Sequence, residues 1–279
     1  MDEKNRLTLE ETKMHLEQMY WDEFVPTGYN GWDELCGGLK KGELTLLASR
    51  PGVGKTSLGL NIVSHIAQRQ PGTILVFSPH LPAREVVIRL LSIGTGLTAK
   101  SLLDGSLSAA ELAEKHTEYF SSQKSNIKID PTTMPSIEAI SRSSHSIPDL
   151  QLLVVHHIER VCKPFLMWDH TLPWNENNEP KDKVLQALRA IAKELHVPVL
   201  CTMHSHRSLE RRKNKRPRLE DLKKAEVSAE LADQIVFLYR DRYYDPDGND
   251  GAECIIAKSS QGSTGMVALD WDYTTGRFL

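Results

Sequence analysis

Short apolar runs recur along the chain, separated by stretches in which apolar residues return at helical spacing. The runs predicted as strands cover residues 44–48, 73–78, 126–130, 150–155, 197–202, 231–239, 252–257 and 266–271. Most of these runs are almost continuously apolar, which is typical of strands buried on both faces. The pattern therefore predicts a sheet with helices on each side of it.

The stretches between these runs have the apolar spacing of amphipathic helices. Helices are predicted over residues 8–24, 29–39, 58–70, 82–92, 108–121, 135–144 and 181–195. Strands that alternate with helices predict an α/β fold with a mainly parallel, twisted sheet. Two stretches, 163–180 and 210–218, are predicted as long loops because they are rich in Pro, Asn, Trp or basic residues.

The first predicted helix is set apart from the rest of the chain by the helix-breaking residues Pro26 and Gly28. We therefore divide the chain into a linker-like helix over residues 1–25 and one larger domain over residues 26–279. The helix carries a loose set of Met and aromatic residues. This set fits packing on its own domain or docking on another subunit, and the pattern does not separate the two.

Composition argues against a strongly basic, a disulfide-rich or a membrane-spanning protein. The 279 residues are 40% hydrophobic and 25% charged, with a net charge of −3, so there is no global basic field for nucleic acid. The four cysteines lie far apart and are predicted to be buried thiols in a reducing compartment. The absence of a signal peptide and of an 18-residue apolar run predicts a cytoplasmic protein without membrane spans.

A phosphate-binding loop joins the first predicted strand to the helix that follows it. Gly52 and Gly54 allow backbone N–H groups to turn toward phosphate oxygens, and the helix N-terminus adds a positive dipole. Lys55 is expected to reach the β- and γ-phosphates of ATP, and the Thr56 hydroxyl is expected to hold Mg²⁺. The usual first glycine of this motif is Ser49. The predicted nucleotide-binding residues are Ser49, Arg50, Pro51, Gly52, Val53, Gly54, Lys55, Thr56 and Ser57.

A dense basic run lies within residues 210–218. The candidate contacts to the phosphates of single-stranded DNA in this run are Arg211, Arg212, Lys213, Lys215 and Arg216. A solvated loop is the alternative, since the rest of the surface is not basic.

Many short blocks occur in an order that resembles the C-terminal motor domain of DnaB-type replicative helicases. The blocks are Pro26-Thr27-Gly28-Tyr29, Gly37-Gly38-Leu39, residues 49–56, Asn61-Ile62, residues 192–199, Arg207-Ser208-Leu209-Glu210, Lys215-Arg216-Pro217, Asp221-Leu222, Ala232-Asp233, Tyr239-Arg240-Asp241 and residues 255–258. The resemblance runs from about Pro26 to the C-terminus. It implies a RecA-like P-loop fold, ATP with Mg²⁺, a homo-oligomeric ring of usually six subunits, and movement on single-stranded DNA.

The catalytic positions of that family carry different residues in this chain. The positions of the water-activating Glu, the Walker B Asp and the γ-phosphate-sensing Gln align with His80, His156 and His204. Of the Lys-x-Arg pair that reaches the next subunit's ATP, Lys258 remains as the candidate trans-acting finger, and Ser260 replaces the Arg. The family's DNA-contacting loop aligns with residues 223–226, which adds Lys223 and Lys224 to the DNA candidates and puts Glu226 at the place of a glycine.

Three hypotheses follow from these replacements. The first is an ATP-binding domain with weak or no hydrolysis, acting as a regulatory ring component or in co-assembly with an active helicase. The second is an active 5′–3′ DNA helicase, in which another acid such as Glu159 or Asp130 restores hydrolysis. The third is a non-motor scaffold, in which His80, His156 and His204 bind Zn²⁺ or a similar metal; drift after loss of hydrolysis would also explain these histidines.

Overall fold

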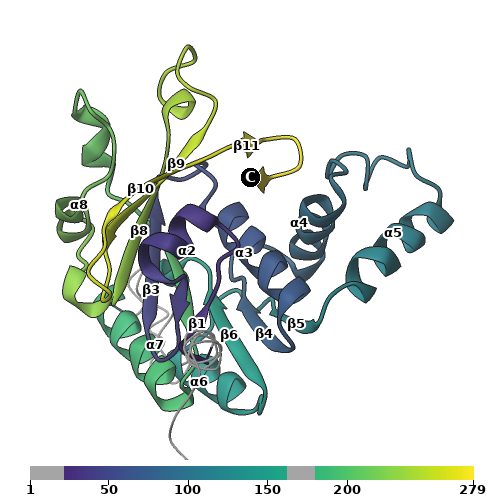
Figure 1. The fold of residues 1–279 in the computed structure, drawn as a ribbon, viewed down its shortest axis with the longest axis horizontal. Helices are drawn as coiled ribbons and strands as arrows, with labels where there is room; N and C mark the ends of the chain where they lie inside the picture. Colours follow the sequence, from purple (N-terminus) through teal and green to yellow (C-terminus); the bar gives the residue numbers. More distant parts are fainter. Residues whose placement is uncertain (1–21, 162–179) are drawn as a thin grey trace, which may run out of the picture.

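The computed structural model describes residues 22–161 and 180–279 (Figure 1). Most of the predicted helix over residues 8–24 and nearly all of the predicted loop over 163–180 lie outside the described residues. The helix prediction is wrong at its last residue, because Phe24–Val25 forms strand β1. This strand pairs with β2 (Leu39–Lys40) in an antiparallel ribbon.

The described residues contain a mainly parallel eight-stranded sheet, which confirms the predicted α/β fold. Its order is β10-β9-β8-β3-β7-β6-β4-β5. The strands from β8 to β5 in this order are parallel, whereas β9 and β10 add an antiparallel edge. The strands are β3 (Leu44–Ser49), β4 (Gly72–Phe77), β5 (Ser125–Asp130), β6 (Leu150–Val155), β7 (Val199–His204), β8 (Gln234–Arg240), β9 (Ala252–Lys258) and β10 (Gly265–Leu269).

Helices cover both faces of this sheet, as the sequence predicts. One apolar cluster joins the sheet to α2 (Asn30–Cys36), α3 (Lys55–Arg69), α4 (Ala83–Thr95) and α5 (Ala109–Ser121). A second cluster joins the other face to α6 (Ile137–His145), α7 (Lys181–Leu195) and α8 (Leu219–Lys224). In Figure 1, α4 and α5 lie on the side of the molecule away from β9 and β10.

Three predicted element boundaries are wrong for local reasons. The strand predicted from Val197 begins at Val199, because the Val197 N–H still bonds the Ala192 carbonyl at the end of α7. The strand predicted from Leu231 begins at Gln234, after a 3-10 turn over Ala229–Leu231. The last predicted strand is divided into β10 and β11 (Trp271–Asp272), and β11 pairs with β12 (Arg277–Phe278).

The topology brings four loops together at one edge of the sheet. Strands β3, β7, β6 and β4 are consecutive neighbours and run parallel, so their carboxyl ends share one edge. The loop after β3 holds the phosphate-binding motif, and the other three ends are followed or formed by histidines. Ligands of open parallel sheets bind outside the carboxyl ends of the strands, and this edge is therefore where the functional site is expected.

Glu226, which follows α8, has a left-handed backbone with φ +60. Its side chain is 91% exposed, and the ion pair with Lys181 spans 4.0 Å, so little holds the carboxylate in place. We expect Glu226→Gly to stabilise the fold by about 0.5–1 kcal/mol, because glycine adopts this backbone without a Cβ clash. Urea unfolding followed by circular dichroism measures the change.

Glu226→Ala is the matched control for this substitution. It removes the carboxylate but keeps the Cβ, so we expect it to leave the stability near that of the wild type. An equal gain from Ala and Gly would mean that charge, and not backbone strain, is responsible.

Candidate functional site

The phosphate loop spans residues 50–54 between β3 and α3. Gly52 and Gly54 have φ values of +78 and +120, which side chains rarely adopt. A Cβ at Gly54 would lie 3.0 Å from the Phe278 ring. Ser49, at the position of the motif's first glycine, is fully buried at the end of β3, and its hydroxyl donates to the Arg50 carbonyl over 3.0 Å. The loop therefore keeps its backbone turn without the first glycine.

Lys55 and Thr56 begin α3 beneath this loop. Only 4% of Lys55 is exposed, and burial lowers the pKa of its ammonium to about 8, against the opposing attraction of Glu159. Thr56 Oγ1 lies 3.3 Å from His80 Nε2. A buried cation at a helix N-terminus is an arrangement that an anionic ligand would stabilise.

A cavity of about 360 Å³ opens above the phosphate loop. Of the predicted loop residues, its walls include Pro51, Gly52, Gly54, Lys55, Thr56 and Ser57. The other wall residues include His80, His157, His204, Arg89 and Trp271. Sequence reasoning missed Arg89 and Trp271, because neither belongs to a motif. Arg240 lies over the Trp271 ring at 4.9 Å, and its Nη1 is 3.4 Å from the Val53 carbonyl oxygen, which ties the Trp271 wall to the loop.

The predicted histidines come from three neighbouring strand ends. His80 follows β4, His156 follows β6, and His204 ends β7. His80 and His156 lie with their ring centroids 6.0 Å apart. His204, however, contacts the ring of His157 (4.6 Å), and His157 also contacts His80 (3.9 Å). His157 is thus the central ring of the cluster.

His156 turns away from its neighbour His157. It is fully buried against α3, where a Cβ at Gly59 would lie 2.8 Å from its Cε1 atom. Neither of its ring nitrogens has a hydrogen-bond partner within the described residues. His157 follows with φ +54, which turns its side chain toward the phosphate loop. Period-two alternation along β6 was a signal that only one of the two rings could face the site.

Among the described residues, the three groups placed to share a metal ion are His157, Glu159 and His204. Their ligand atoms all lie within 4.8 Å of one another. The predicted set of His80, His156 and His204 does not form such a group there, because His156 packs on α3. Glu159 accepts a hydrogen bond from the His204 backbone N–H, and its Oε1 lies 3.5 Å from His204 Nδ1.

Burial controls the charges in this cluster. It lowers the pKa of His80 and of His204 to about 4 and that of His156 to about 3, with the nearby Lys55 adding to the effect. The pKa of His157 is lowered for the same reasons, and burial raises the pKa of Glu159. At neutral pH the imidazoles are therefore uncharged.

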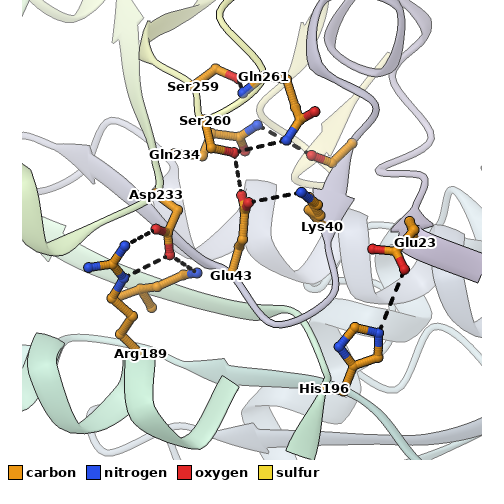
Figure 2. A network of polar contacts seen from close by, with 12 residues as sticks. Glu23, Lys40, Glu43, Arg189, His196, Asp233, Gln234, Ser259, Ser260 and Gln261 are labelled. Carbon is orange, nitrogen blue, oxygen red and sulfur yellow. Dashed lines mark hydrogen bonds and ion pairs between the residues drawn. The ribbon is translucent and has the colours of Figure 1, made fainter. Parts of the chain in front are cut away.

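The predicted trans-acting finger lies at the opposite edge of the sheet. Lys258 pairs with Ile235 near the start of β8, and its ammonium donates to the carbonyl oxygens of Ala229 (2.9 Å) and Ala232 (2.6 Å). Figure 2 shows the neighbouring contacts, in which Ser260 donates to Glu43 over 2.5 Å. The finger position cannot reach the phosphate loop of its own chain.

Figure 2 also shows how this edge is fixed. Asp233 accepts from the Leu44 backbone N–H over 3.0 Å and forms an ion pair with Arg189 of α7 over 2.5 Å. Asp233 is largely buried, so removal of either partner would leave an uncompensated polar group. Through these two contacts, Asp233 connects α7 to the start of β3.

The structure divides the predicted DNA-binding residues into two groups. Arg212 pairs with the buried Asp221 (2.8 Å), and Arg216 pairs with Glu253 through two bonds of 2.5 and 2.6 Å. Lys215 lies over the Tyr244 ring at 5.5 Å. The other candidates are the exposed Arg211, which ends a 3-10 turn over Arg207–Arg211, and the exposed Lys213 in the loop after it. Lys223 and Lys224 lie in the last turn of α8.

Cys36, Cys201 and Cys254 are buried free thiols, as predicted, and Cys162 lies outside the described residues. No helix in the described part of the chain is long and apolar enough to cross a membrane.

Comparison with known proteins identifies the family. Residues 24–279 match the family described as DnaB-like helicase C terminal domain. The chain is 29% identical over 260 residues to the replicative DNA helicase DnaB of Geobacillus stearothermophilus, covering 91% of this chain and 56% of that protein. It is 30% identical over 261 residues to DnaB of Buchnera aphidicola subsp. Baizongia pistaciae, covering 91% and 55%. The chain thus spans about half the length of the curated relatives it matches.

Solved structures agree on the fold. An ATPase domain of known structure superposes with a TM-score of 0.79 at 23% identity, over 99% of both chains. A DnaB-like replicative helicase, studied together with its interactions with primase, superposes with a TM-score of 0.78 at 24% identity, over 99% of this chain and 67% of the other. The fold is that of the RecA-like DnaB ATPase domain, and with the match over residues 24–279 the chain belongs to the family of DnaB-like helicase C-terminal domains.

Proposed function

We propose that this chain binds ATP with Mg²⁺, hydrolyses it slowly or not at all, and acts in the cytoplasm in DNA replication as a regulatory component of a helicase-like ring. The observation that carries the proposal is the contrast at one edge of the sheet. The phosphate loop keeps its backbone turn around a buried Lys55, whereas the strand ends that face it carry imidazoles.

The site fits a nucleotide on grounds of charge and shape. Lys55 is a buried cation that forms no ion pair with any described residue, and the glycines of the loop leave the backbone open to phosphate oxygens. Thr56 supplies the hydroxyl that would hold Mg²⁺, which prefers oxygen ligands. Bound Mg²⁺ would supply charge neutralisation for the phosphates, while the loop and Lys55 would orient them.

Hydrolysis needs groups that this site lacks at the expected places. The family resemblance aligns His80 and His156 with carboxylates, and an imidazole carries no negative charge in either of its common protonation states. A neutral ring attracts hydrated Mg²⁺ less than a carboxylate does. Burial lowers the pKa of His80 to about 4, so this imidazole is a weaker general base than an ordinary histidine. A positioned base contributes roughly 10²–10⁴ in rate and an arginine finger about 10³–10⁵. Ser260 at the finger position supplies no charge, so slow turnover is expected.

The location of Lys258 and Ser260, which align with the family's trans-acting finger, supports assembly into a ring. Lys258 and Ser260 lie at the amino edge of the parallel strands, whereas the phosphate loop lies at the carboxyl edge. Residues at opposite edges of one domain can meet at a single ATP only when two subunits pack edge to edge. The resemblance implies such a ring, formed either by copies of this chain or with an active helicase.

We expect the full chain to bind ATP with Mg²⁺ and to release phosphate at least about 10³-fold more slowly than an active family member, with and without single-stranded DNA. Equilibrium binding of a fluorescent ATP analogue and phosphate release on the same sample measure both properties. Lys55→Ala should abolish binding, because it removes the cation beneath the loop.

The same experiment separates the alternatives. DNA-stimulated turnover that Lys55→Ala abolishes would show a working helicase motor, and the proposal of impaired hydrolysis would be wrong. Failure of the folded wild type to bind nucleotide would favour a non-motor scaffold.

The exposed basic residues are the better candidates for DNA. We expect Arg211→Ala with Lys213→Ala to lower the slope of log K against log salt for single-stranded DNA by about 1.4, because each lost phosphate contact contributes about 0.7. Fluorescence anisotropy with labelled oligonucleotide across a salt series measures the slope. Arg216→Ala should instead lower the melting temperature, because Glu253 loses its bidentate partner.

Lys100→Ala with Lys115→Ala is the control of equal charge at a distant surface. An unchanged slope in the loop variant, or an equal loss in the control, would rule out a specific contact through Arg211 and Lys213. No binding of the wild type at low salt would remove DNA from the proposed function.

A further inference from the structure

Two imidazoles and a carboxylate converge beside the phosphate loop, at the adjacent ends of β6 and β7. His157 and Glu159 come from the turn after β6, and His204 is the last residue of β7. Their ligand atoms lie within 4.8 Å of one another. Two imidazole nitrogens and one carboxylate oxygen form a donor set that divalent transition metals bind in proteins.

The spacing within this group suits a shared ion. Two ligands of one tetrahedral Zn²⁺ lie about 3.4 Å apart, because each is about 2.1 Å from the metal. His204 Nδ1 and Glu159 Oε1 are separated by 3.5 Å. The third group, His157, has its ring centroid 4.6 Å from that of His204. Small rotations of the side chains would bring all three donors to one centre.

One oxygen of Glu159 has no assigned role in the fold. Glu159 Oε1 accepts from the His204 backbone N–H, whereas Oε2 is buried without a hydrogen-bond partner within the described residues. An unsatisfied buried carboxylate oxygen destabilises a protein unless something binds it. A cation between this carboxylate and the two rings would satisfy it.

The backbone holds the group in position. His157 is in the left-handed region, and its N–H donates to Thr202 Oγ1 over 2.9 Å. This bond joins the turn after β6 to β7, two residues before His204. Such backbone strain is maintained only where the surroundings fix it, and here it turns the His157 ring toward His204.

The group is accessible from two sides. His204 lines the cavity above the phosphate loop and also a second, polar cavity of about 440 Å³ that Glu159 lines. An ion therefore has an entry path and room for an exchangeable fourth ligand. Lys55, Arg50 and Lys181 are among the nearby cations, and they oppose an ion, so a bound anion such as phosphate is the favoured fourth ligand.

The geometry points to a divalent transition-metal site formed by His157, Glu159 and His204, separate from the Mg²⁺ that would accompany a nucleotide. This ligand set differs from the histidines expected from the sequence, since it excludes His80 and His156. It requires no nucleotide, and it stands whether or not ATP is hydrolysed.

The test is Zn²⁺ binding to the full chain without a histidine tag and without nucleotide, by competition with a chromophoric chelator. Co²⁺ in place of Zn²⁺ reports the coordination geometry through its visible absorption. We expect one ion per chain, and we expect His204→Ala and the isosteric Glu159→Gln each to weaken binding at least about tenfold. Circular dichroism and thermal melting confirm that each variant is folded.

Two controls decide between ligand sets. His145→Ala removes an exposed histidine of α6, and His80→Ala removes the ring that contacts His157 without belonging to the set. Both should keep the ion. Unchanged affinity in folded Glu159→Gln and His204→Ala would overturn the site, as would loss of the ion in His80→Ala together with its retention in Glu159→Gln.

Discussion

The parallel register of four neighbouring strands is the constraint on which the site depends. Hydrogen bonding of β3 to β7 sets Ser49 opposite His204, and β6 and β4 continue the same alignment toward Val155 and Phe77. Because side chains alternate between faces, a shift of one residue would turn every strand-end group to the wrong side. The phosphate loop and the histidine cluster therefore share a single structural cause, which is the pairing of buried apolar strands.

In this arrangement, the groups that would bind phosphate and the side chains that would catalyse hydrolysis belong to different segments of the chain. Phosphate binding uses backbone N–H groups, a helix N-terminus and Lys55, all of which follow from the turn between β3 and α3. Catalysis uses side chains at the ends of other strands, which can change without disturbing the turn. A chain can thus retain the loop while the neighbouring positions become His80, His156 and His204. The proposed loss of hydrolysis with retention of binding is consistent with this separation of phosphate-binding groups from catalytic side chains.

The sheet and the phosphate loop were predictable from the sequence because apolar runs, helical periodicity and the glycines of the loop are local patterns. Alternation along β6 indicated that only one of the two rings after it could face the site. That His157 turns toward the site was not predictable, because it depends on the positive φ of His157 and on the space that Gly59 leaves for His156. The ion pair of Arg216 was not predictable from the sequence, because its partner Glu253 is distant along the chain. The sequence shows how many basic residues the run contains. The ion pairs formed in the fold decide which of these residues are available to a ligand.

The carboxyl and amino edges of the parallel strands carry different functional residues. The carboxyl edge carries the phosphate loop, and the amino edge carries Lys258 and Ser260, with Lys258 held by backbone carbonyls and Ser260 by Glu43. In a ring the second edge would face the first edge of the next subunit. Since Ser260 brings no charge to that junction, a neighbour's nucleotide would be held with less transition-state stabilisation than an arginine provides. Under the proposed function, nucleotide at such a junction would act mainly as a bridge between subunits, which would favour assembly over movement.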